Sequence, residues 1–275
     1  MKELVHRRPI LAFVMLAHLG SWLGWSSWWL SESGIGVLPF RPSFEGITLV
    51  NQVGLFAGPF AVVLLVTRVL DGRGSPCALL ARAFSLRGRR AVHLVALLVL
   101  PFVLATPYLV LGSGITAGGL TASMPASTLV TYLTYLAGGP LQEEPGWSGF
   151  ALPRMQRSMH PLAASVGLGL VHRFWHAPLS FTQEWDTTRS DVGQLAAYLL
   201  LVVALSIVPS WVFNTSEGSS IPAIFAHHSL NWGLLFAGST LGVLVENTWP
   251  ATLTMSALAA ALLGRTRGRL GHGTH

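Results

Sequence analysis

Residues 192–213 read VGQLAAYLLLVVALSIVPSWVF, an apolar stretch that contains no Asp, Glu, Lys or Arg. A helix that crosses the hydrocarbon core of a bilayer needs about 20 such residues. A bilayer offers no water to the backbone, so a single chain segment can cross it only as a helix that satisfies its own N–H and C=O groups. This stretch therefore predicts a membrane-spanning helix.

The same pattern recurs along the chain. Further apolar stretches cover residues 9–30, 47–69, 91–112, 127–153, 161–182, 219–238 and 241–263. The stretch at 127–153 contains Gly138, Gly139, Pro140 and Pro145, so we expect this helix to be kinked or split. The sequence predicts an all-α, polytopic transmembrane helix bundle of about eight spans, with residues 1–275 forming one integral membrane domain.

Composition excludes a soluble enzyme. Hydrophobic residues make up 51% of the chain and charged residues 10%, whereas soluble domains carry about 25% charged residues. The net charge of +6 comes from basic residues that lie between the apolar stretches. This placement follows the positive-inside rule and puts both termini in the cytoplasm. We expect a multi-pass protein of the cell membrane, with the lipid bilayer as a partner and no nucleic acid.

The segment 71–90 differs from the apolar stretches. It places alanine, leucine and phenylalanine side chains between arginines. This alternation is typical of an amphipathic helix that lies on a membrane surface. We expect a cytoplasmic amphipathic segment here.

Ionisable side chains interrupt three of the apolar stretches. A charged group at the centre of a membrane helix costs about 2.5–3.5 kcal/mol, so such groups are usually functional. The polar residues fall into three clusters: Gln142, Glu143 and Glu144; His172, Arg173 and His176; and His227, His228 and Asn231. Convergence of the three clusters on one cavity would satisfy all of them.

Helical geometry divides the members of each cluster. Neighbouring residues lie about 100° apart on a helix, so Glu143 and Glu144 cannot point to the same place. His172 and His176 are one turn apart and share a face, as do His227 and Asn231.

These groups suit two kinds of chemistry. A carboxylate and two imidazoles can bind a divalent metal, and zinc is the metal that they suit. A bound metal supplies hydroxide at neutral pH. Alternatively, a buried glutamate can act directly as a general base. The Asn231 amide could stabilise an oxyanion. Amide hydrolysis would use all of these groups, although a proton relay would use many of them as well.

Taken together, the clusters resemble the CPBP superfamily of CAAX-processing and bacteriocin-processing intramembrane endopeptidases, also called the ABI family. Its paired-glutamate motif, Glu-Glu-x-x-x-Arg, resembles EEPGWSGFALPRM at 143–155, and its Phe-x-x-x-His motif resembles GLVHRFWHAPLSF at 169–181. Its His-x-x-x-Asn motif resembles HHSLNW at 227–232. The matching region, 124–240, would hold the catalytic core.

The resemblance implies an intramembrane endopeptidase that hydrolyses a peptide bond in a peptide or membrane-anchored protein. The implied catalytic residues are Glu143, Glu144, His176, His227 and Asn231. The implied metal ligands are Glu143, His176 and His227. His172 is an additional candidate that the resemblance does not imply, because it could join His176 as a second histidine ligand.

Two positions depart from the family pattern. Ser148 stands where the family has arginine, and His172 stands where it has phenylalanine. Without that arginine, an ionised Glu144 needs another partner or must carry a proton. Our hypothesis is that His172 or Arg173 supplies this partner.

Two other functions remain open. A transporter could use the same carboxylates and imidazoles as a proton relay, but its fold would usually show an inverted repeat with two broken helices. The sequence shows one interrupted helix and no such repeat. The second alternative is a noncatalytic immunity or scaffold protein on the same fold, which Ser148 favours.

Overall fold

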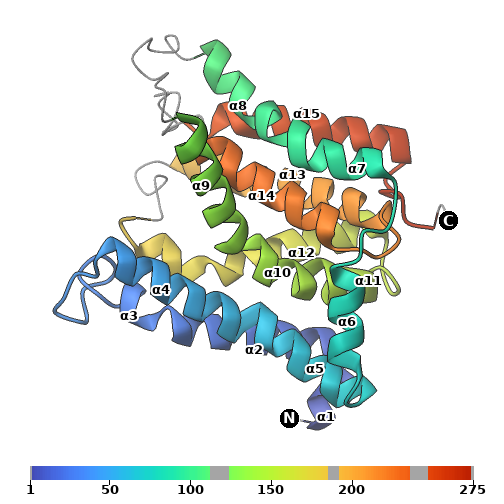
Figure 1. Cartoon of the computed structure of the whole chain (residues 1–275), viewed down its shortest axis with the longest axis horizontal. Helices are drawn as coiled ribbons and strands as arrows, with labels where there is room; N and C mark the ends of the chain where they lie inside the picture. Colours follow the sequence, from blue (N-terminus) through green and yellow to red (C-terminus); the bar gives the residue numbers. More distant parts are fainter. Residues whose placement is uncertain (1, 112–123, 185–191, 236–246, 274–275) are drawn as a thin grey trace.

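The computed structural model describes residues 2–111, 124–184, 192–235 and 247–273 of the 275-residue chain. Every regular element within these ranges is a helix (Figure 1). The predicted all-α class is therefore confirmed. The longer helices run side by side, and loops and short helices connect them.

The helices follow the apolar stretches closely. The α-helices are α1 (Lys2–Arg7), α2 (Pro9–Gly24), α3 (Ser26–Trp29), α4 (Phe44–Leu55), α5 (Ala61–Asp71), α6 (Ser75–Ala83), α7 (Arg90–Leu94), α8 (Leu100–Leu111), α9 (Met124–Ala137), α10 (Pro140–Gly146), α11 (Leu152–Met155), α12 (Pro161–Trp175), α13 (Val192–Asn214), α14 (Ile221–Leu235) and α15 (Trp249–Thr266). Three π-helical turns, Phe56–Phe60, Val95–Val99 and Trp147–Ala151, join α4 to α5, α7 to α8 and α10 to α11. A 3₁₀ helix, Ala177–Phe181, follows α12.

Within the described ranges, three helices are long and apolar enough to cross a membrane: Phe44–Asp71, Arg90–Tyr108 and Val192–Asn214. In the last of these, 39% of the apolar window is buried, so most of its apolar surface faces outward. Exposed side chains such as Leu199 and Leu200 lie on that surface. An outward-facing apolar surface of this kind suits lipid rather than water. The predicted eight spans and cytoplasmic termini stay predictions.

Two apolar clusters flank the centre of the molecule. One is formed mainly by α2, α4, α5 and the residues around α11, and includes Phe13, Val63 and Phe150. The other joins α8, α13, α14 and α15 around Leu104 and Met255. In Figure 1, α2 and α4 lie at one edge and α8 and α15 at the other, with α10, α12 and α14 between them. Helices α12 and α14 also contribute to these clusters, through Leu168 in the first and Leu230 in the second, so the polar side chains lie where the two apolar clusters approach each other.

The interrupted stretch at 127–153 is split, as its glycines predicted. Helix α9 ends at Ala137 and α10 begins at Pro140. Amide side chains bind the backbone carbonyls that this break releases. Asn51 Nδ2 donates to Gly138 O at 3.3 Å, and Gln142 Nε2 donates to Ala137 O at 2.5 Å. Buried carbonyls need such partners, so α4 and α10 hold the break in place.

Two further predictions concern the connections. Helix α6 lies within the segment 71–90, and its contacts with α5 and with the turn Trp147–Ala151 place it against the bundle. The cytoplasmic location of this segment stays a prediction. The apolar stretches at 219–238 and 241–263 correspond to α14 and α15, but residues 236–246, where one ends and the other begins, lie outside the described part.

Candidate active site

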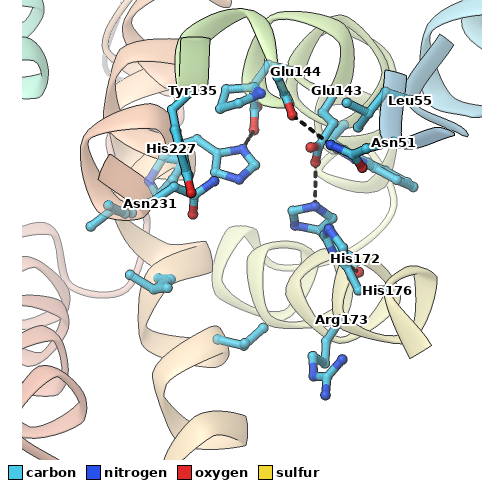
Figure 2. A pocket seen from close by; sticks show the side chains of 18 of the residues that line it. Asn51, Leu55, Tyr135, Glu143, Glu144, His172, Arg173, His176, His227 and Asn231 are labelled. Atoms are coloured by element: carbon cyan, nitrogen blue, oxygen red, sulfur yellow. Dashed lines mark hydrogen bonds and ion pairs between the residues drawn. The ribbon is translucent and has the colours of Figure 1, made fainter. Parts of the chain in front are cut away.

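All three polar clusters contribute residues to the lining of one cavity of about 400 Å³, although Gln142 and His228 do not line it. Glu143 and Glu144 reach it from α10, His172 from α12, and His227 and Asn231 from α14, while His176 lines it just beyond the end of α12 (Figure 2). Glu143 and Glu144 are 3% and 5% exposed. The expected convergence of three helices on a common cavity is therefore confirmed.

Glu143 is held by His172. His172 Nε2 lies 2.7 Å from Glu143 Oε2, and the Glu143 side chain is 4% exposed. An ionised carboxylate only accepts hydrogen bonds, so the imidazole donates its Nε2–H. Gly139 allows this arrangement, because a Cβ at that position would lie 3.0 Å from Glu143 Oε1.

His176 completes a group that can bind a metal. Its Nδ1 lies 3.2 Å from the carbonyl oxygen of His172, so Nδ1 donates and Nε2 is the acceptor nitrogen of the neutral ring. One ligand atom from each of Glu143, His172 and His176 lies within 4.8 Å of the others. Two imidazoles and one glutamate form the ligand set of one class of catalytic zinc site. The donor set therefore fits a divalent cation, with the proton between Glu143 and His172 displaced on binding.

Glu144 points to the other side of the cavity. His227 Nδ1 lies 2.8 Å from Glu144 Oε1, and Ser148 Oγ donates a hydrogen bond to Glu144 Oε2. The two glutamates thus take different partners, as the helical geometry predicted. Of the four candidate metal ligands, three lie together, whereas His227 is paired with Glu144.

The hypothesis that His172 or Arg173 replaces the missing arginine is wrong. His172 binds Glu143, and Arg173 Nη2 donates to Ser180 Oγ at 2.9 Å. Glu144 instead has two other partners, His227 from α14 and Ser148 on its own helical segment. Ser148 lies one turn along the same helical segment, which brings its hydroxyl to the carboxylate.

Aromatic rings enclose the imidazoles. The His172 ring lies 5.5 Å from the Trp147 ring and 5.6 Å from the Trp175 ring, and the His176 ring lies 4.4 Å from that of Trp175. Both tryptophans are almost fully buried. Such packing restricts the imidazoles to a few orientations.

Asn51 is a site residue that the sequence reasoning missed. It comes from α4, lines the cavity and binds Gly138 O at the break before α10. The signal was present, because Asn51 and Gln52 are adjacent polar residues inside the apolar stretch at 47–69. Neither is charged, however, and an amide in a membrane helix is a much weaker signal than a glutamate.

Comparison with known proteins gives a consistent result. Residues 125–233 match the family described as type II CAAX prenyl endopeptidase Rce1-like, and this region contains all three motifs. The chain is also similar to CAAX prenyl protease 2 of Methanococcus maripaludis, with 22% identity over 205 residues. That alignment covers 70% of this chain and 74% of the relative. The resemblance to the CAAX-processing endopeptidases is confirmed.

Proposed function

Because residues 125–233 carry the Rce1-like region of the CAAX prenyl endopeptidases, we propose that this chain is an intramembrane endopeptidase. It hydrolyses a peptide bond in a peptide or membrane-anchored protein, with water activated at the buried Glu143 site. The observation that carries the proposal is the convergence of Glu143, His172 and His176 within 4.8 Å on the wall of a cavity.

Glu143 is the proposed general base. Its carboxylate takes a proton from the attacking water, and His172 orients it through the 2.7 Å hydrogen bond. His176 lies beside this pair and positions the water from the other side. The tryptophans around the imidazoles keep the group in a fixed geometry, which lowers the cost of reorganisation during the reaction.

Glu144 and His227 form a second acid–base pair across the cavity. We assign to His227 the proton that the leaving amine needs, with Glu144 stabilising the imidazolium through the 2.8 Å contact. Asn231 lies one turn beyond His227 on α14 and lines the same cavity. Its amide N–H₂ is placed to donate to the oxyanion of the tetrahedral intermediate.

A divalent cation would bind to Glu143, His172 and His176. When bound, a cation such as zinc supplies a Lewis acid and an acidified water. In this case Glu143 would be a ligand instead of the base. The donor set supports both forms of the mechanism, and metal analysis distinguishes them.

The proposed substrate is a prenylated protein or peptide in a membrane, as the name of the relative suggests. We propose that the chain is a multi-pass protein of the cell membrane and that cleavage occurs near the cytoplasmic side. Three long apolar helices with outward-facing apolar surfaces support the membrane location.

The function can be tested on protein purified in detergent. The substrate is a fluorescent peptide with a farnesylated cysteine fourth from its C-terminus, and bound metals are measured on the same samples. We expect cleavage by the wild type and its loss in Glu143→Gln and His176→Ala. Glu45→Gln is the matched control, because Glu45 is exposed and does not line the cavity.

The outcomes separate the alternatives. About one metal ion per chain, lost together with cleavage in both variants, would support the metal-bound form. Cleavage without metal would support Glu143 as the base. Absence of cleavage in the wild type would reject the endopeptidase, and proton-coupled uptake in vesicles would then favour the transporter.

A further inference from the structure

Arg173 is a charged residue of the cavity that the proposed mechanism does not use. It lies next to His172 on α12, and its side chain lines the same cavity. In Figure 2, Glu143 lies on one side of the His172 ring and Arg173 extends on the other side. A ligand that lies along the cavity past His172 can therefore reach both residues.

The described surroundings of the guanidinium are neutral. Its Nη2 donates to Ser180 Oγ at 2.9 Å, and its Cζ lies 4.5 Å from the centre of the Tyr198 ring. Nε is buried without a hydrogen-bond partner. A guanidinium carries five N–H donors, and the hydrogen bonds found within the described ranges use one of them.

No carboxylate of the described residues forms an ion pair with Arg173. Arg173 is partly buried and lines the cavity, so its guanidinium is open to a ligand that enters there. Ser180 and Tyr198 fix the guanidinium without neutralising it. Arginine binds carboxylates through two parallel N–H···O bonds, which makes it suited to a carboxylate ligand.

We propose that Arg173 is a specificity-determining residue that binds a carboxylate of the substrate. This inference rests on the proposed endopeptidase function. Of the carboxylates that a peptide offers, the C-terminal α-carboxylate is the one we assign to Arg173. It would fix the distance between the chain end and the peptide bond that faces Glu143.

Peptide binding tests the inference without relying on cleavage. The protein carries Glu143→Gln, so that the probe stays intact, and the probe is the farnesylated fluorescent peptide as free acid or as C-terminal amide. A lost charge-assisted hydrogen-bonded pair reduces affinity about ten- to hundredfold. We expect the acid to bind more tightly than the amide by this factor.

Arg173→Gln should remove the difference between acid and amide, and Arg173→Lys should restore part of it. Arg154→Gln is the matched control. Arg154 also lies over an aromatic ring, that of Phe150 at 3.8 Å, but it does not line the cavity. A third peptide, an amide with glutamate as its last residue, distinguishes the α-carboxylate from an acidic side chain.

The outcomes are distinct. Equal affinity of acid and amide for the protein with intact Arg173 would overturn the inference, as would a preference for the acid that persists in Arg173→Gln. Tight binding of the glutamate-containing amide would overturn the assignment to the α-carboxylate. Failure of the endopeptidase proposal would appear separately, as wild-type protein that binds the acid through Arg173 but does not cleave it.

Discussion

Replacement of His172 by phenylalanine tests whether this histidine acts on Glu143 or only fills space. Phenylalanine is also the residue that the family motif has at this position. The His172 ring lies 5.5 Å from the Trp147 ring and 5.6 Å from the Trp175 ring, and a phenyl ring in its place can keep both aromatic contacts. What it removes is Nε2, which lies 2.7 Å from Glu143 Oε2.

The magnitude follows from the burial of Glu143. Its side chain is 4% exposed, and His172 is the partner in its described side-chain hydrogen bond. A hydrogen bond to a charged group contributes about 1.5–3 kcal/mol. At about 1.4 kcal/mol per tenfold change, we expect kcat/KM to fall about 10- to 100-fold. The free energy of unfolding should fall by less than this hydrogen-bond energy if Glu143 accepts a proton, because the neutral acid needs no counter-charge.

The assay measures cleavage of the farnesylated peptide and the thermal unfolding midpoint in detergent. His172→Gln is the control, because it retains an N–H donor but loses the ring, and it should keep more activity than His172→Phe. The double variant His172→Phe/Ser148→Arg should not recover, since position 148 faces Glu144 rather than Glu143. Wild-type kcat/KM in His172→Phe, or full recovery in the double variant, would refute the reasoning.

Further predictions concern the residues around Glu143 and His172. Gly139→Ala places a Cβ 3.0 Å from Glu143 Oε1 and should displace the carboxylate by a few tenths of an ångström. We expect kcat/KM to fall about tenfold with little loss of stability, and unchanged kinetics would contradict this prediction. Ser148→Ala removes one of the two described hydrogen bonds of Glu144 and should lower stability by about 1–3 kcal/mol, measured as a lower unfolding midpoint. Asn51→Leu leaves the carbonyl of Gly138 without its partner and should reduce kcat more than substrate affinity. An equal loss of both would show that Asn51 contacts the substrate. A chelator should abolish cleavage if the cation is required, and zinc should restore it in the wild type but not in His172→Phe.

The helices of this protein could be predicted well because their causes are local. Backbone hydrogen bonds of a helix form within one segment, so an apolar stretch long enough to span a bilayer identifies it without knowledge of its neighbours. The split near Gly138 could be predicted for the same reason. The separation of Glu143 from Glu144 also followed from the rotation per residue alone.

The pairing of side chains across helices could not be predicted in this way. The sequence placed carboxylates and imidazoles on three helices, and the motifs suggested His176 and His227 as partners of Glu143. The tertiary structure keeps His176 beside Glu143, but it pairs Glu143 directly with His172 and gives His227 to Glu144. Asn51 joined the site through the packing of α4 against the helix break.

The sequence by itself therefore determined that this is an apolar helical protein with a buried polar site, and which residue types the site contains. The tertiary structure decided which carboxylate meets which imidazole, and that Arg173, among the described residues, contacts Ser180 and Tyr198 and forms no ion pair. The physical reason is that helix formation depends on the segment itself, whereas the contacts between helices depend on their rotation and crossing. Side-chain packing over the whole bundle sets both of these.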